Sequence, residues 1–260
     1  MEPQKFGVVT IQFFDDVDQA NYFHNEMIEY ELFQDGTIPL EFYNVTKKQE
    51  LFETFEKLIQ KIIDENYFFF LQINSHGCEN GMGANLKEMI TWEELFFYTR
   101  RINELFNGAL VIMLAVCTGN AMIQAIEPSQ RAPFGLIIGA FIPISFEQAK
   151  NAFNAFYRKP FPDAKYIRDG IEKMNKAVGK TSSPLFYGIN KELCFDKICD
   201  PDRDPAFFKS IVYQQVLRIT KTKGMTDKLF CEVVESVDND IRGYLSFTWT
   251  YFKNYFLFRD

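Results

Sequence analysis

The sequence predicts an α/β protein in which helices cover both faces of a central, mostly parallel sheet of six strands, a three-layer sandwich. Two observations lead to this fold class. Short apolar runs alternate with longer amphipathic stretches through the first 190 residues. The apolar runs are hydrophobic at consecutive positions, as strands are when both of their faces are buried. With 260 residues, of which 29 are Phe and 12 are Tyr, the chain can build a large aromatic core.

The first half of the chain supplies four of the strands and three helices. The apolar run 6–14 predicts the first strand, and a helix is expected to start at Asp16 or Asp18 and to reach about Tyr30. The run 40–45 predicts the second strand. Between 47 and 65 the apolar side chains recur every three or four residues, which predicts a helix with an inner face of Leu51, Phe55, Leu58 and Ile62.

The aromatic run 67–74 predicts the third strand, and 109–117 predicts the fourth. Thr91 and Glu94 have the spacing of a capping box and start the helix between these strands. That helix has an apolar stripe, which we expect to face the core: Leu95, Tyr98, Ile102 and Leu105.

The fifth strand is predicted over 134–144, and Ser145 with Gln148 then caps the next helix. A further helix is expected from about Asp163 to Val178, followed by the sixth strand over 183–190. These elements complete a domain over 1–190.

The pattern changes after Asn190. A polar turn region is expected over 194–205, and helical patterns follow at 206–222 and 226–242, before an aromatic end. We interpret 191–260 as a mostly helical extension that packs on the main domain and could dock a regulatory partner.

Composition excludes several classes of function. A net charge of −7 argues against nucleic acid as a ligand, because phosphate binding depends on clustered Lys and Arg. No apolar segment is long enough for a membrane span, and the N-terminal segment has no leader pattern, so we expect a cytoplasmic protein that does not bind membranes. The five cysteines are irregularly spaced, which favours reduced thiols. With only two histidines and no CxxC, neither a metal site nor any other cofactor is expected.

The ends of the third and fourth strands carry the residues of most chemical interest. His76 follows the third strand in "FFFLQINSHGCENGM", and Cys117 ends the fourth in "LVIMLAVCTGN". Neighbouring parallel strands would bring their carboxyl ends within about 5 Å, so the imidazole and the thiol could cooperate in acyl transfer. The backbone N–H groups of Gly77 and Cys117 could then bind the oxyanion.

Taken singly, each residue has a more ordinary interpretation. A histidine after a strand is more often a turn residue than a catalyst, and a cysteine that ends a buried strand is more often part of the core. The conjunction of the two, in the arrangement that open α/β sheets use for their sites, favours a His/Cys dyad.

The two motifs resemble those of the caspase-like cysteine peptidases, which include caspases, metacaspases, legumains and CHAT-domain proteases. The resemblance covers about residues 6–190. It implies a thiol protease of the caspase-like fold, with His76 as the acid and base group, Cys117 as the nucleophile, and Gly77 with Cys117 as the oxyanion hole. It further implies a protein substrate, and a bacterial defence or cell-death pathway in which the enzyme is a proteolytic activator.

Substrate specificity is predicted to depart from that of caspases. The segment after the first strand has no arginine that could bind aspartate, and Ala115 stands where relatives specific for basic residues have an acid. Asp15 or Asp16 could serve a basic side chain, although capping of a helix is the more ordinary role. We favour a neutral or apolar residue before the scissile bond, with 142–145, including Ser145, in the wall of the cleft.

Few residues separate Cys117 from the fifth strand, which predicts a single-chain enzyme that needs no maturation cut between 120 and 134. A P-loop is excluded, because "VGKTSS" lacks the first glycine of that pattern. A nucleotide-binding α/β domain and a catalytically silent, peptidase-like scaffold remain as alternatives. Cys78 is expected to be incidental, with a regulatory thiol as the alternative.

Overall fold

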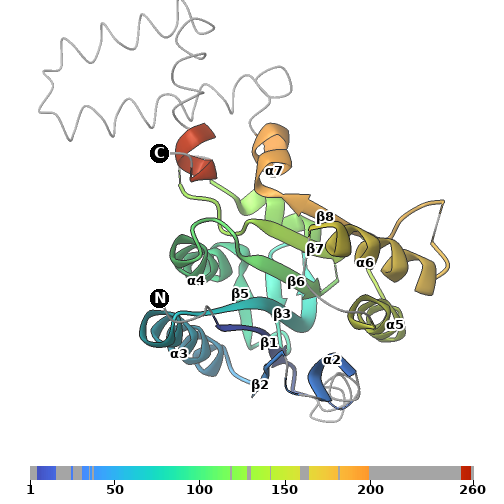
Figure 1. Cartoon of the computed structure of the whole chain (residues 1–260), viewed down its shortest axis with the longest axis horizontal. Coiled ribbons are helices and arrows are strands. Elements are labelled where there is room, and N and C mark those ends of the chain that lie inside the picture. The colour runs from blue at the N-terminus through green and yellow to red at the C-terminus, as the bar shows by residue number, and fades with distance from the viewer. Residues whose placement is uncertain are drawn as a thin grey trace, which may run out of the picture. The chain divides into compact units, whose positions relative to one another are not determined.

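The computed structural model contains a central sheet built from the six predicted apolar segments (Figure 1). It describes residues 5–15, 25, 31–34, 36, 38–117, 119–127, 130–140, 142–158, 164–180, 182–198 and 253–258. The six strands are β1 (Lys5–Phe13), β2 (Leu40–Val45), β3 (Tyr67–Cys78), β6 (Val111–Ala115), β7 (Leu136–Ala140) and β8 (Phe186–Asn190).

The order of these strands across the sheet is β2-β1-β3-β6-β7-β8. Neighbouring strands are parallel from β2 to β7, and only β8 runs antiparallel, beside β7. The predicted mostly parallel sheet is therefore confirmed. The chain winds outward from β1 in two directions, so the winding reverses between β1 and β3, where open α/β sheets commonly hold their sites.

Helices cover both faces of this sheet (Figure 1). α3 (Lys48–Glu65) and α4 (Trp92–Leu105) lie on one face, and α5 (Phe146–Tyr157) and α6 (Ala164–Ala177) lie on the other. On the second face, side chains of α5 and α6 share one apolar cluster with strand residues such as Val8, Met113 and Ile138. This arrangement confirms the predicted three layers.

Two helices begin where the sequence predicts. The N–H of Glu94 donates to Thr91 Oγ1 at 3.2 Å, and the N–H of Thr91 donates to the Glu94 carboxylate at 2.9 Å. Ser145 and Gln148 exchange the same pair of bonds at the start of α5. Each pair satisfies N–H groups that a helix start otherwise leaves unpaired.

The predicted inner face of α3 is buried, but the stripe of α4 is wrong at its last position. Leu105 is 40% exposed. The helix ends there, and the next residue, Phe106, is buried instead; its ring lies tilted against Phe68 and edge-on against Phe69. Because the helix gives way to a turn after Leu105, the side chain buried in the core is that of Phe106 and not that of Leu105.

Three predicted strand boundaries are also wrong. β6 ends at Ala115, so Cys117 lies two residues beyond the strand and not at its last position. β7 covers only 136–140 of the predicted 134–144, because the chain bends and Pro143 has no N–H to donate to a ladder. β8 begins at Phe186 and not at 183. The segment after Cys117 forms a 3₁₀ helix, η1 (Gly119–Ala125).

The largest correction concerns the segment around His76. β3 does not end at Asn74 but continues to Cys78, and its last three residues pair antiparallel with β4 (Gly81–Gly83). β4 in turn pairs with β5 (Met89–Thr91). The stretch from Cys78 to Gly83 is therefore a hairpin.

Parts of the remaining predictions fall on described residues. The predicted first helix lies largely outside them; residue 25 is helical, and α2 (Glu31–Gln34) lies beyond the expected end at Tyr30. The polar turn predicted from 194 is wrong at its start, because α7 (Lys191–Ile198) is helical. The helices predicted at 206–222 and 226–242 lie outside the described residues, whereas 253–257 are helical.

The chain divides into two compact units, one of residues 1–125 and 133–190, the other of 126–132 and 191–260. In the second unit the N–H of Ala132 donates to the carbonyl of Phe256 at 3.2 Å, and Phe195 packs on Phe256. This contact joins 126–132 to the C-terminal segment. No helix within the described ranges is long and apolar enough to cross a membrane.

Candidate active site

The predicted pairing of the third and fourth strands is present. β3 and β6 are parallel neighbours, and Asn74 pairs with Ala115 as the last pair of their ladder. His76 and Cys117 each follow that pair by two residues. The sheet therefore delivers the backbones of both residues to the same edge, beside the point where the winding reverses.

Gly77 lies against the backbone of Cys117. A Cβ atom at Gly77 would overlap Val116 Cγ1 and the carbonyl oxygen of Cys117, and it would lie 3.2 Å from the Cys117 nitrogen. Only glycine allows so close an approach. The two residues that the sequence predicts as oxyanion donors are therefore adjacent through their backbones.

The thiol of Cys117 is partly exposed and lies two residues beyond the end of β6. Its Sγ donates a hydrogen bond to the carbonyl oxygen of Ile144 at 3.2 Å. This bond places the Ile144 carbonyl, in the segment predicted as a wall of the cleft, beside the thiol. Ser145 itself is exposed and caps α5. Ala115 is 7% exposed and lies two residues before Cys117 in the sequence.

The His76 side chain is exposed and lies against the ring of Phe14. The two ring centroids are 5.1 Å apart and the rings are nearly perpendicular, at 85°. Phe14 is only 4% exposed, so it is a fixed support. No side chain or backbone group in the described ranges forms a hydrogen bond with the His76 ring. Phe14 was not predicted as a site residue, although an aromatic residue directly after β1, the strand next to β3, was a usable signal.

An open cavity of about 400 Å³ lies beside His76. Its walls come from the end of β3, from the hairpin of β4 and β5 with its connection, and from the residue that follows Phe14. The lining residues are Asp15, His76, Gly77, Cys78, Gly83, Ala84, Asn85, Leu86 and Met89. The volume falls within the range of small-ligand sites.

The predicted substrate residue Asp15 is exposed and lies at this cavity. Asn85 Nδ2 donates to its carboxylate at 3.2 Å. Asp16 lies outside the described residues. Cys78, which we expected to be incidental, also lines the cavity. Asn85, in the connection between β4 and β5, and Met89, at the start of β5, also line the cavity and were not predicted as site residues.

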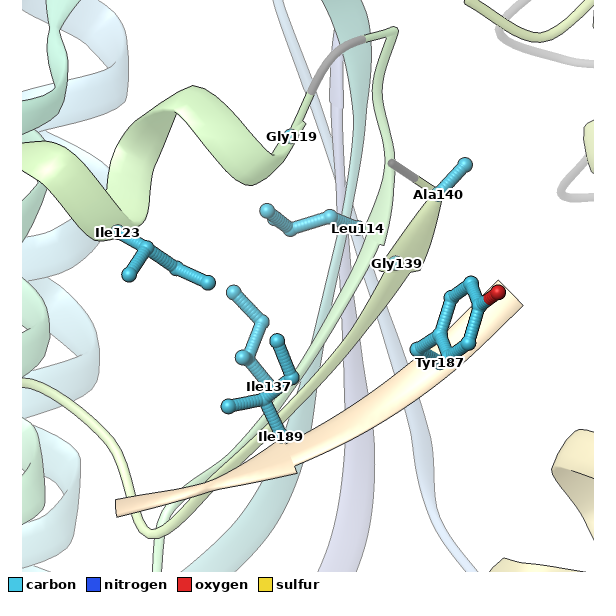
Figure 2. A pocket seen from close by; sticks show the side chains of 8 residues that line it. All are labelled: Leu114, Gly119, Ile123, Ile137, Gly139, Ala140, Tyr187 and Ile189. Carbon is cyan, nitrogen blue, oxygen red and sulfur yellow. The ribbon is translucent and has the colours of Figure 1, made fainter. Parts of the chain in front are cut away.

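A second cavity, on the face of the sheet that η1 borders, holds only about 10 Å³, the space of a single water molecule. Figure 2 shows Ile123 of η1 pointing toward Leu114 and Ile137 across this space. Its walls are almost entirely apolar. This cavity is too small for a substrate side chain, and we regard it as a packing gap.

Tyr43 and Glu50, which lie away from the site, have shifted pKa values, and neither shift indicates a second reactive site. Burial, with a contribution from Glu41, raises the pKa of Tyr43 to about 12. Hydrogen bonds from the backbone N–H groups of Thr46 and Lys47 lower the pKa of Glu50. None of these residues lines the cavity. Within the described ranges, no three His, Cys, Asp or Glu side chains gather as a metal site would require.

The comparisons with known proteins identify no family: no protein-family model matches the chain, and no curated protein is similar to it in sequence. The site therefore has to be interpreted from its own chemistry. The site brings together a thiol and an imidazole that each follow the last pair of the β3–β6 ladder by two residues, the touching backbones of Gly77 and Cys117, and an open cavity beside the imidazole.

Proposed function

We propose that the chain is a caspase-like cysteine endopeptidase in which Cys117 is the nucleophile and His76 is the acid and base group. The observation that carries the proposal is the close approach of the Gly77 backbone to Cys117 at the ends of two neighbouring parallel strands. A glycine forced against the nucleophile's backbone serves an oxyanion hole well, because its N–H is not screened by a side chain.

The proposed reaction begins when His76 takes the proton of the Cys117 thiol. The hydrogen bond from Sγ to Ile144 is given up, and the thiolate attacks the carbonyl carbon of the scissile peptide bond. The oxyanion of the tetrahedral intermediate accepts hydrogen bonds from the N–H groups of Gly77 and Cys117.

The intermediate then collapses. The C–N bond breaks, the leaving nitrogen takes the proton from His76, and the acyl group stays on sulfur as a thioester. Water attacks this thioester while His76 takes one of its protons, and the proton returns to the sulfur as the carboxylic acid leaves. His76 suits both roles, because an imidazole nitrogen can accept a proton in one step and donate it in the next.

The partner is proposed to be a specific protein, cut as the activating step of a bacterial defence or cell-death pathway. The three described cysteines, Cys78, Cys117 and Cys194, are free thiols. Free thiols favour a reducing compartment, and a cytoplasmic location is part of this proposal.

The test is labelling with thiol-reactive peptide probes, such as acyloxymethyl ketones that differ in the residue before the scissile bond. Wild type should be labelled at Cys117, and the position should be read by mass spectrometry of the digested protein. Cys117→Ala should abolish labelling, and His76→Ala should slow it by about 10²-fold or more.

Cys78→Ala is the matched control, because it removes the other partly exposed thiol of the described residues while keeping the dyad. This variant should still be labelled at Cys117. Equal labelling of wild type, His76→Ala and Cys117→Ala would contradict the peptidase proposal. Such a result would favour a peptidase-like domain that binds a protein without cutting it.

A further inference from the structure

The cavity beside His76 has a rigid rim. Asn85 Oδ1 accepts hydrogen bonds from the N–H groups of Lys87 and Glu88, at 2.8 and 3.1 Å, and Asn85 Nδ2 donates to Asp15. The N–H of Ala84 donates to the carbonyl of Glu88 at 3.1 Å. One asparagine thus fixes the connection between β4 and β5 and ties it to the end of β1.

The hairpin that carries this rim is fixed at its base as well. Ser75 Oγ donates to the carbonyl of Gly83 at 3.1 Å, and Trp92 Nε1 donates to the carbonyl of Glu79 at 3.0 Å. Trp92 and Ser75 are both buried. The cavity is therefore formed in advance of any ligand, which lowers the cost of ordering on binding.

The lining of the cavity is apolar inside and acidic at one edge. Gly83 and Ala84, both buried, and the half-buried Met89 line it, together with Leu86, which has 92% of its surface exposed. The Asp15 carboxylate disfavours an acidic ligand at the same place.

His76 and Gly77 line this cavity, whereas Cys117 does not. In the proposed reaction Cys117 holds the acyl part of the substrate and His76 protonates the leaving nitrogen. A cavity reached from the histidine and not from the nucleophile lies on the leaving-group side. The substrate residue that follows the scissile bond is attached to that nitrogen.

We propose that this cavity binds the side chain of the residue that follows the scissile bond, and that it selects an apolar residue of the size of Leu or Met. This inference rests on the proposed peptidase function and adds to it a second specificity site. Met89 and Leu86 are its specificity-determining residues, and Asp15 acts against Asp or Glu at this position.

The test is digestion of a complex peptide library, followed by mass spectrometry that identifies the residues on both sides of each cut. We expect Leu, Ile, Val, Met and Phe after the cut at least threefold above their abundance in the library, and Asp and Glu below theirs. Cuts that persist in Cys117→Ala are subtracted, so that only cleavage by the proposed nucleophile is counted.

Met89→Glu should reduce the apolar preference severalfold, because it places a charge in the lining of the cavity, and Leu86→Ser should reduce it less. Ile63→Ser is the matched control: Ile63 is also exposed, at 59%, but it lies on α3 and not at the cavity. This control should leave the preference unchanged.

The possible results separate the two proposals. If the wild-type protein makes no cuts other than those that Cys117→Ala also makes, the peptidase function is overturned. Cuts that depend on Cys117 but show no preference after the scissile bond, or a preference that Met89→Glu leaves intact, would overturn the role of this cavity while the peptidase function stands.

Discussion

The backbone of Gly77 lies against the backbone of Cys117, so closely that no side chain larger than hydrogen fits at position 77. The contact arises because β3 continues past its ladder with β6, toward its antiparallel pairing with β4. The proposed oxyanion donors and the nucleophile thus depend on one glycine for their relative position.

Gly77→Ala is predicted to remove activity while the protein still folds. The added methyl group would force the backbone away from Val116 and Cys117. The loss of one oxyanion donor typically lowers kcat by about 10²- to 10³-fold, and overpacking costs about 1–3 kcal/mol of stability. Probe labelling rate and thermal unfolding, measured on the same sample, check both numbers. Gly36→Ala, at a position with positive φ and open space around it, tests backbone strain alone and should retain activity.

Phe14 is predicted to hold His76 in its working orientation. The His76 ring packs nearly perpendicular to the Phe14 ring, so a smaller side chain at position 14 would let the imidazole move. A displacement of about 1 Å can cost as much as 10²-fold in rate. We expect Phe14→Leu to lower kcat by about 10-fold with little change in KM, and Phe14→Tyr to restore most of it.

If Phe14 contributed only to stability, a different result is expected. Phe14→Leu would then change the melting temperature but leave the pH profile of labelling as in wild type. A shift of that profile in Phe14→Leu, with recovery in Phe14→Tyr, would support the positioning role. Equal activity of Phe14→Leu and wild type would contradict it.

Much of the fold followed from local pattern. The apolar runs, the helix face of α3 and the capping residues Thr91 and Ser145 are set by interactions within a few residues, and these predictions are confirmed. The predicted positions at element boundaries are wrong where contacts between residues far apart in the sequence determine which side chain is buried. Phe106 takes the buried place that the pattern gave to Leu105, because Phe68 and Phe69 of β3 offer it an aromatic surface.

The site was predictable in part for the same reason. Neighbouring strands and their carboxyl ends follow from the α/β pattern, so the sequence could indicate that His76 and Cys117 share an edge. The hairpin of β4 and β5 has only three residues in each strand, too few for a period to be visible. The cavity that it forms with Asp15 therefore emerged only from the structure.

Asn175 is predicted to be a major source of stability for the edge of the sheet. Its Oδ1 accepts from the N–H groups of Leu185 and Phe186, at 2.7 and 2.8 Å. Its Nδ2 donates to the carbonyls of Ile171 and Phe186, at 3.0 and 2.8 Å. One buried side chain thus joins α6 to the start of β8.

Asn175→Ala would leave the N–H groups of Leu185 and Phe186 without this acceptor, at a cost of about 1–3 kcal/mol for each buried group. We expect the free energy of unfolding to fall by about 3 kcal/mol, measured by urea denaturation. Asn44→Ala, on the exposed side of β2, is the control and should change it by less than about 0.5 kcal/mol. A small effect at Asn175 would show that water replaces the side chain.

Glu94 links the start of α4 to α3, and it makes stability depend on pH. Its carboxylate accepts from the Thr91 N–H at 2.9 Å and from Lys48 Nζ at 2.7 Å. Burial alone would raise the pKa of Glu94, but the bonds from Lys48 and Thr91 outweigh burial and lower that pKa below its ordinary value of 4.5. The folded protein therefore holds the proton on this group less readily than the unfolded chain does.

A carboxyl group with a lowered folded-state pKa stabilises the protein fully above the unfolded-state pKa, and this contribution is lost as the pH falls through the folded-state pKa. Glu94→Gln should accordingly be less stable than wild type at neutral pH, by about 0.5 kcal/mol for a partly exposed pair. The difference should shrink as the pH falls below 4.5. Urea denaturation across this range checks the prediction, with Glu93→Gln, an exposed neighbour in the same helical turn, as the control. A difference that stays constant with pH would show that Glu94 acts through packing and not through its charge.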